Sequence, residues 1–338
     1  MLMNITFFLF VIYAWGLGYS LSYFVKKSEN WLERNLMNLG FGLASFVIIS
    51  VIFNLLKIPL DWKIFLIISL IIPSYKLSRL IQEKKIKIPK PKLKIKKSSI
   101  FIFVVFILFF FTLFMYTKGS FVYPYLENDD PWSHAVGIEY VSKEKTAFRQ
   151  DDFYFKYLDP YPPGYDVLMG ILHQTSPDFV WTLKFFNALI LSLGIFFFYF
   201  FTKEFMKSKS KALIATFIFA SIPCYLTHFI WAHSLAVTLF FPAFYALVKI
   251  EKDHRWKYIA GVVAAAILLT QPSQGVKFGI MFILFFIIKS ILNKKIDKDT
   301  FIAGISGISL SLNWWIPVLL KNRGAGAVLL KCRIQNKR

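Results

Sequence analysis

About ten apolar runs, separated by short charged connections, constrain the fold of this chain more than any other feature. Runs of about 18 or more apolar residues are typical of membrane-spanning helices, and 57% of the residues are hydrophobic. We therefore predict an all-α, polytopic integral membrane protein with about ten transmembrane helices. The predicted spans are residues 3–25, 37–56, 62–79, 99–117, 180–202, 212–231, 235–250, 258–272, 276–292 and 300–320.

Lysine and arginine residues mark one side of the predicted bundle. Five connections are basic and alternate with connections that are short or acidic, so the positive-inside rule assigns the basic ones to the cytoplasm. The N-terminus and the long loop 118–178 then lie on the outer side of the cell membrane. Membrane orientation thus accounts for the net charge of +21, and no nucleic-acid partner is expected. The basic connections are residues 26–36, 76–98, 203–211, 249–257 and 289–299.

A basic segment that contains prolines, residues 84–98, divides the chain into two parts. Its prolines rule out a continuous helix, and its charge fits a cytoplasmic linker next to the lipid surface. We predict a three-helix membrane unit over residues 1–83 and a second membrane unit over residues 99–338, which holds every feature that suggests chemistry. The chain ends soon after the last span, and C-terminal truncation is one interpretation of that ending.

The outer loop 118–178 concentrates the acidic residues, since it holds 10 of the 19 aspartates and glutamates and two of the five histidines. Pro131 suits the first turn of a helix and Asp130 suits its N-cap, which predicts a helix over residues 132–141. A cap needs one side chain, so Asp129 is left for another role. His134 follows Asp130 by four residues and shares its helix face, although salt bridging or capping is the commoner reason for such a pair.

A stiff turn follows later in the same loop. Residues 159–166 contain three prolines and a glycine, which predicts a turn and then a short helix over residues 165–173 that cannot span the bilayer. Asp166 and His173 are seven residues apart and are expected on one face of this helix. Asp166 either complements the helix N-terminus or belongs to a site for an anionic headgroup.

The motifs of this loop resemble those of a known superfamily. Asn128-Asp129-Asp130-Pro131-Trp132-Ser133-His134 resembles the first-loop motif of oligosaccharyltransferase catalytic subunits, and Tyr161-Pro162-Pro163-Gly164-Tyr165 resembles a turn of mannosyl- and arabinosyl-type transferases that use lipid-phosphate sugars. Both groups belong to the GT-C superfamily of membrane glycosyltransferases, and the resemblance covers about residues 99–320. It implies a sugar donor on polyprenyl or dolichyl phosphate, with Asp129 or Asp130 as base or metal ligand.

The chain departs from the oligosaccharyltransferase pattern at the second acidic motif. The comparable stretch, residues 222–234, contains His228 and His233 and no carboxylate, which weakens the case for a metal site of that type. The two histidines are either interface residues or ligands of the donor phosphate. A divalent metal, Mg²⁺ or Mn²⁺, stays an option, and its candidate ligands are Asp129, Asp130 and His134.

The reaction that the resemblance implies is attack of an acceptor hydroxyl or amide on the anomeric carbon of a lipid-phosphate sugar. A carboxylate takes the acceptor proton, and fixed positive groups stabilise the departing phosphate. The partners are membrane lipids, the lipid-linked sugar, and a glycan, lipid or protein acceptor. The candidate catalytic residues are Asp129 and Asp130, and the candidate substrate-binding residues are His134, Arg149, Lys156, Tyr161, Tyr165, Asp166, His228, His233 and Lys277.

Two other functions are compatible with the sequence. A transporter or flippase for lipid-linked saccharides would place ionisable residues near the bilayer midplane, whereas the acids of this chain gather in one outer loop. A non-catalytic or truncated relative of the superfamily would bind lipid carriers or organise a complex, and the missing second acidic motif is compatible with that function.

Overall fold

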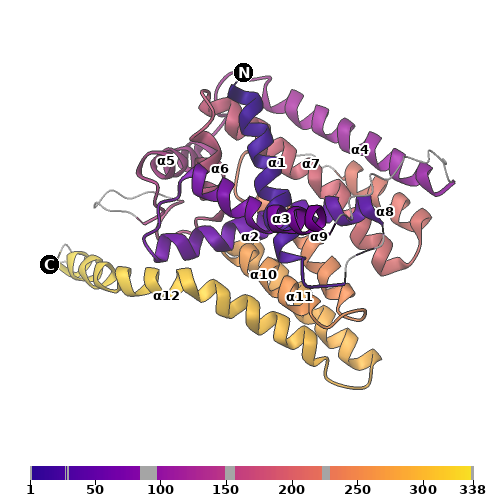
Figure 1. Ribbon diagram of the computed structural model, residues 1–338. Coiled ribbons are helices and arrows are strands. Elements are labelled where there is room, and N and C mark those ends of the chain that lie inside the picture. Colours follow the sequence, from indigo (N-terminus) through magenta and orange to yellow (C-terminus); the bar gives the residue numbers. More distant parts are fainter. Residues whose placement is uncertain are drawn as a thin grey trace.

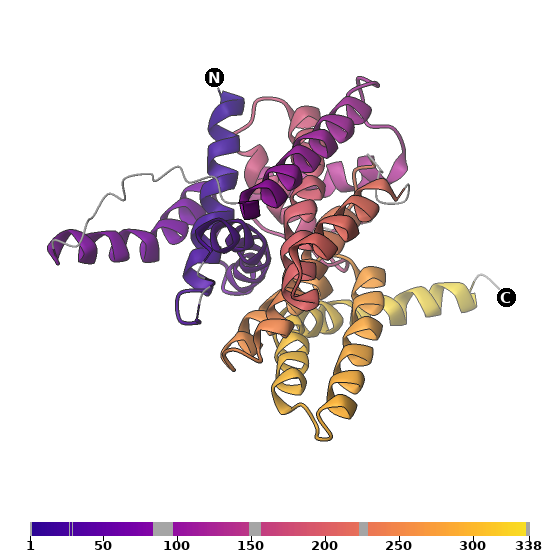
Figure 2. The ribbon, with the colours of Figure 1, turned by 90° about the vertical axis from the view of Figure 1, so that its right-hand side faces the viewer.

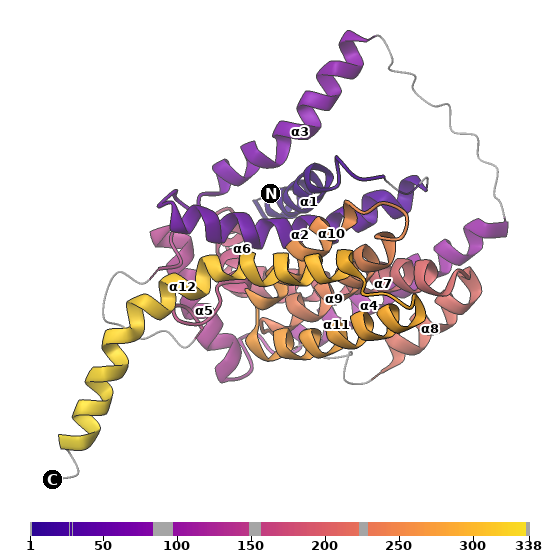
Figure 3. The ribbon, with the colours of Figure 1, turned by 90° about the horizontal axis from the view of Figure 1, so that it is seen from below.

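The computed structural model describes residues 2–26, 28, 30–83, 97–148, 157–222 and 229–335, and within these ranges every regular element is a helix. The helices form a bundle from which the ends of α3 and α12 project (Figure 1, Figure 3). They are α1 (Leu2–Leu21), α2 (Trp31–Leu55), α3 (Trp62–Gln82), α4 (Lys97–Ser120), α5 (Asp129–Glu144), α6 (Gly164–His173), α7 (Phe179–Met206), α8 (Lys209–Ser221), α9 (His233–Lys249), α10 (Trp256–Leu268), α11 (Pro272–Leu292) and α12 (Lys298–Gln335).

Across the part of the chain that the structure describes, six helices are long and apolar enough to cross a membrane: α2, α3, α4, α7, α11 and the Lys298–Lys321 part of α12. The apolar parts of α1, α9 and α10 are shorter, at 10–17 residues. An all-helical protein embedded in a membrane is therefore supported, whereas the number of ten spans is not confirmed. The helices α11 and α12 form a hairpin at the edge of the bundle (Figure 2).

One predicted span, residues 212–231, is wrong at its C-terminal end, because α8 stops at Ser221. The backbone of Ile222 is extended, with a ψ of 121°. Residue 223 is a proline, and a proline disfavours helical geometry in the residue before it. His233, which lies between this span and the predicted span 235–250, is the first residue of α9.

The helices α2 and α7 form the centre of the bundle. In their most apolar windows 72% and 83% of the residues are buried, against 11% in α3 and in α11. The helix α2 packs against α1, α6, α7, α9 and α10, so the predicted N-terminal unit is in direct contact with the rest of the protein. A Cβ atom on Gly42 would lie 1.6 Å from the Ala14 carbonyl oxygen, so glycine is what allows α1 and α2 to approach this closely.

An ion-pair network closes the end of the bundle where α2 begins and where α7 and α9 end. Buried Glu33 pairs with Lys203 and accepts a hydrogen bond of 2.7 Å from the Tyr245 hydroxyl. Buried Glu204 pairs with Lys249 at 2.8 Å. The helices α5 and α6 lie at the opposite, left-hand end of the bundle in Figure 1. The helices of the acidic loop 118–178 are therefore well separated from this ion-pair network.

Candidate functional site

The N-terminus of α5 sets the position of both candidate catalytic aspartates. The prediction that Asp130 caps this helix is wrong, because Asn128 is the N-cap and its side-chain oxygen accepts a hydrogen bond of 3.2 Å from the Asp130 N–H. Asp129 and Asp130 occupy the first turn, where the helix dipole favours carboxylates. The helix continues to Glu144, beyond the predicted end near Val141. Neither aspartate is used as the cap.

A buried carboxylate–imidazole pair joins α5 to α6. The Nδ1 atom of His134 lies 2.6 Å from the Oδ1 atom of Asp166, and the Nε2 atom of the same ring accepts a hydrogen bond of 3.3 Å from the Ala232 N–H. A ring nitrogen that accepts a hydrogen bond carries no proton, so we assign the proton of the neutral ring to Nδ1, which donates to Asp166. Burial raises the pKa of Asp166, and His134 opposes that rise. With both ring nitrogens engaged, His134 ties α5 to α6 and to the segment before α9.

A second contact between α5 and α6 follows about two turns later along α6. The Nε2 atom of His173 lies 3.4 Å from a carboxylate oxygen of Glu139 on α5. Asp166 and His173 therefore share one helix face, as their spacing predicts, and that face contacts α5. The helix that carries them spans Gly164–His173 and confirms the predicted short helix.

Gly137 allows the close approach of the two helices, because a Cβ atom there would lie 2.5 Å from the Oδ2 atom of Asp166. We expect Gly137→Ala to destabilise the protein by about 1–3 kcal/mol, since the methyl group overpacks a tight contact. Gly279→Ala on α11 is the matched control, because a Cβ atom at that position meets nothing within 4 Å. Thermal unfolding in detergent micelles compares the two, and equal midpoints would contradict the tight packing at Gly137.

Asp130 lies beside a cluster of aromatic side chains. The Tyr157 hydroxyl donates a hydrogen bond to its carboxylate, and the Tyr157 ring stacks on His134 with 4.2 Å between ring centroids. The Tyr161 ring packs edge-on against Tyr157 at 4.8 Å. Burial raises the pKa of Tyr161, and the nearby carboxylate of Asp166 raises it further, so its hydroxyl stays neutral. Asp130 is half-buried in this cluster, whereas Asp129 is exposed.

His233 connects the acidic part of the site to its basic part. His233 is half-buried and directly follows Ala232, whose N–H donates to His134 of α5. The Nε2 atom of His233 lies 3.2 Å from the side-chain nitrogen of Gln271, whose oxygen caps α11. The amide nitrogen of Gln271 therefore donates to His233. Lys277 is exposed and lies six residues after Gln271 on α11.

Tyr165 lies between His134 and α7. Its side chain is 1% exposed, and its hydroxyl donates a hydrogen bond of 3.1 Å to Asn187 of α7. The ring packs edge-on against His134 at 5.1 Å. Tyr165 thus helps to hold the His134 ring in position. Direct contact of Tyr165 with a substrate stays a prediction. Three other predicted substrate-binding residues, Arg149, Lys156 and His228, lie outside the described residues.

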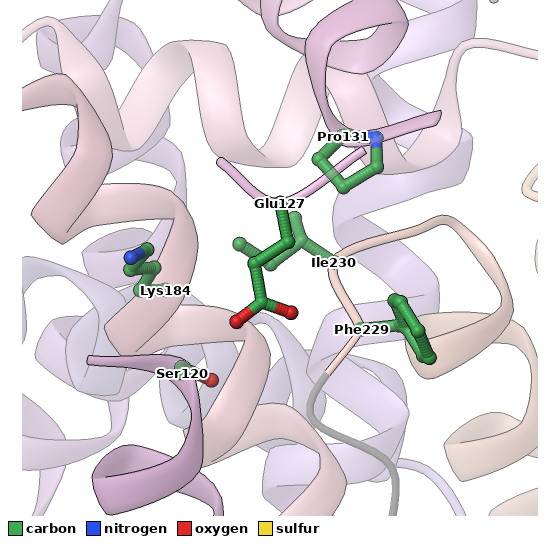
Figure 4. Close-up of a pocket in the computed structure, with 6 residues that line it drawn as sticks. All are labelled: Ser120, Glu127, Pro131, Lys184, Phe229 and Ile230. Carbon is green, nitrogen blue, oxygen red and sulfur yellow. The ribbon is translucent and has the colours of Figure 1, made fainter. Parts of the chain in front are cut away.

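Lys184 of α7 is a residue near the site that sequence reasoning missed. It lines a small pocket together with Ser120, Glu127, Pro131, Phe229 and Ile230, and the Glu127 carboxylate points into this pocket (Figure 4). Lys184 is 1% exposed, and its ammonium group donates to the carbonyl oxygen of Tyr123. The sequence did contain a signal for this residue, because Lys184 lies inside an apolar run. Placing a charged side chain in a membrane costs free energy, so such a lysine is expected to have a specific role.

Lys321 of α12 is another missed residue, because it pairs with the buried carboxylate of Asp159 in the proline-rich turn. The two residues are 162 positions apart. Phe148 stacks on Trp314 of α12 at 5.2 Å. The helix α12 therefore helps to hold Phe148 and the proline-rich turn in position.

The described residues do not fit a metal site built from Asp129, Asp130 and His134. Both nitrogens of His134 are engaged by Asp166 and by the Ala232 N–H, so neither is available to a metal ion. Within the described ranges, no group of three or more His, Cys, Asp or Glu side chains is positioned to hold a metal ion.

Comparison with other proteins finds no family model and no curated sequence that matches this chain. Its function is therefore inferred from the site and from the membrane-type fold.

Proposed function

We propose that the protein is a membrane glycosyltransferase that moves a sugar from a polyprenyl- or dolichyl-phosphate donor to a glycan, lipid or protein acceptor. The observation that carries this proposal is the set of contacts that links α5 to α11. Tyr157 donates to Asp130 and stacks on His134, and His134 accepts from the Ala232 N–H. The next residue, His233, accepts from Gln271, the N-cap of the helix that carries Lys277. Sugar transfer from a lipid phosphate needs a base near the acceptor and positive charge near the departing phosphate. The resemblance of the two loop motifs to the GT-C superfamily supports the same function.

Asp130 is the proposed base. Its carboxylate is half-buried at the start of α5 and accepts a hydrogen bond from Tyr157, and such a bond favours the ionised form that a base needs. The acceptor oxygen forms a bond to the anomeric carbon while its proton moves to Asp130. The bond from the anomeric carbon to the phosphate oxygen breaks, and its electron pair leaves with the phosphate.

Lys277 and His233 are the proposed partners of the departing phosphate. Lys277 is exposed at the start of α11 and offers a positive charge. The Nε2 atom of His233 accepts from Gln271, so the proton of the neutral ring is on Nδ1 and is available as a donor. Arg149, Lys156 and His228 remain proposed contributors from sequence alone.

We further propose that the end of the bundle with α5 and α6 faces the outer side of the membrane. The opposite end holds the lysines of the ion-pair network at Glu33 and Glu204, as the positive-inside rule expects for a cytoplasmic end.

Ten crossings require the shorter helices to span as well. The helix α9 has 17 residues, about 26 Å at 1.5 Å per residue, which approaches the roughly 30 Å of a hydrocarbon core.

A transport function has less support. The ionisable side chains of α2, α7 and α9 lie near the helix ends, as Glu33, Lys184, Glu204 and Lys249 illustrate. A transporter of charged saccharides is expected to place such groups near the midplane of these central helices. The distribution of charge therefore favours chemistry at the membrane surface.

Membranes that contain the protein are expected to transfer radiolabelled sugar from at least one polyprenyl-phosphate or dolichyl-phosphate donor. The label should appear in glycan, lipid or protein fractions, and membranes from the same host without the protein serve as the control. Absence of transfer from a panel of hexose and pentose donors, with the protein folded, would contradict the proposal.

A further inference from the structure

The segment between α4 and α5 exposes several aromatic and apolar side chains. Val122 is 77% exposed and Tyr125 is 60% exposed. We define the outer aromatic patch as Phe121, Val122, Tyr123, Tyr125, Trp132 and Val136, which are all at least 40% exposed. Apolar groups that are exposed together in this way mark an interaction surface.

Two hydrogen bonds and a ring contact hold the outer aromatic patch in its conformation. The buried ammonium group of Lys184 donates to the Tyr123 carbonyl oxygen and lies 5.5 Å from the centre of the Phe121 ring. The indole nitrogen of Trp132 donates a hydrogen bond of 3.1 Å to the Leu126 carbonyl oxygen. Because a buried lysine is used to fix this backbone, the outward orientation of the aromatic side chains is built into the fold.

The outer aromatic patch continues the exposed side of α4. Phe110, Phe111 and Phe114 of this helix are 59–61% exposed, as expected for side chains that face hydrocarbon chains. The helix ends at Ser120, directly before the patch. Residues just beyond the end of a span lie at the level of the lipid headgroups, where tyrosine and tryptophan are enriched because their rings are apolar and their tips are polar.

We propose that the outer aromatic patch inserts into the bilayer interface, so that its partner is the lipid surface. The N-terminus of α5, which follows the patch, is then held at the depth of the headgroups together with Glu127, Asp129 and Asp130. This placement is independent of the proposed glycosyl transfer, because it follows from side-chain exposure and from continuity with α4.

Spin labels test the placement in reconstituted phospholipid vesicles. Cys224 and Cys332 are the only cysteines of the chain, and serine replaces both before a single nitroxide label is introduced at Val122→Cys. Dissolved oxygen collides with labels in lipid, whereas a water-soluble nickel chelate collides with labels in water. The matched controls are Phe110→Cys on the lipid-facing side of α4 and Lys143→Cys on α5, whose native side chain is 70% exposed.

We expect the ratio of oxygen to nickel collisions at residue 122 to be several-fold higher than at residue 143 and to approach that at residue 110. Nickel access equal to that at residue 143 would place the patch in water and overturn the proposal. Low access to both reagents would mean that protein, such as a second copy of the chain, covers the patch, and would overturn it as well. Circular dichroism checks that every labelled variant keeps its helix content.

Lys184→Met is expected to raise nickel access at residue 122, because the backbone at Tyr123 loses its buried hydrogen-bond donor. Unchanged access in this variant would contradict the anchoring role of Lys184. Its sugar-transfer rate, where transfer is observed, is recorded separately, so that a failure of the proposed function is distinguished from a failure of the membrane placement.

Discussion

Asp130→Asn is expected to lower the rate of sugar transfer by about 100- to 10,000-fold, which is the usual contribution of a general base. The amide keeps the shape of the side chain and still accepts the hydrogen bond from Tyr157, so the fold is retained. Asp129→Asn is expected to cause a smaller loss, because Asp129 is exposed outside the aromatic cluster. Initial rates with a saturating lipid-phosphate sugar measure the difference.

Glu144→Gln is the control for these two variants, since it removes an exposed carboxylate at the other end of α5 and is expected to leave the rate unchanged. Equal losses in Asp129→Asn and Asp130→Asn would contradict the assignment of the base to Asp130. A larger loss in Asp129→Asn would transfer that assignment to Asp129.

His134→Ala is expected to destabilise the protein by about 3–5 kcal/mol, because it leaves the buried carboxylate of Asp166 without its partner. The same change removes the acceptor of the Ala232 N–H. Asp166→Asn is expected to cost only about 1 kcal/mol, since its amide oxygen still accepts the hydrogen bond from the His134 ring. Thermal unfolding in detergent micelles measures both effects.

The double replacement His134→Leu with Asp166→Leu separates charge from packing. It buries no charge, so it is expected to be more stable than His134→Ala alone, even though two residues have changed. Wild-type stability of His134→Ala would contradict the buried pair. A double replacement less stable than His134→Ala would show that shape matters more than charge at this position.

The regular elements were largely predictable because they depend on local pattern. Apolar runs and basic connections locate the long helices, and the proline-rich turn locates α6 at Gly164–His173. The N-terminus of α5 was not predicted correctly, because asparagine and aspartate are equally good caps and both Asn128 and Asp130 precede the helix core. The end of α8 at Ser221 shows that Pro223 outweighs the apolar run around it.

The contacts within the site were not predictable, because they join residues that are distant in the sequence. Asp166 and His134 are 32 positions apart, and no local period relates them. The pair formed by Lys321 and Asp159 joins the last helix to the outer loop. Spacing did predict that Asp166 shares a helix face with His173, but spacing does not say which helix that face contacts.

The pairing of His134 changes which residues are available for chemistry. A metal site at Asp129, Asp130 and His134 was one option from the sequence, whereas the structure uses His134 to join α5, α6 and the segment before α9. Asp130 then accepts a hydrogen bond from Tyr157, and His233 accepts one from Gln271 at the start of the helix that carries Lys277. The proposed mechanism therefore uses Asp130 as the base and Lys277 as the cation, and it needs no metal ligand from His134.

The most direct test of the proposed base measures donor binding and sugar transfer in one preparation of Asp130→Asn. The proposed mechanism predicts that the variant binds a radiolabelled polyprenyl-phosphate sugar as tightly as the wild type, because Lys277 and His233 are intact, and that it transfers almost no sugar. Transfer at the wild-type rate by the folded Asp130→Asn protein would contradict the role of Asp130.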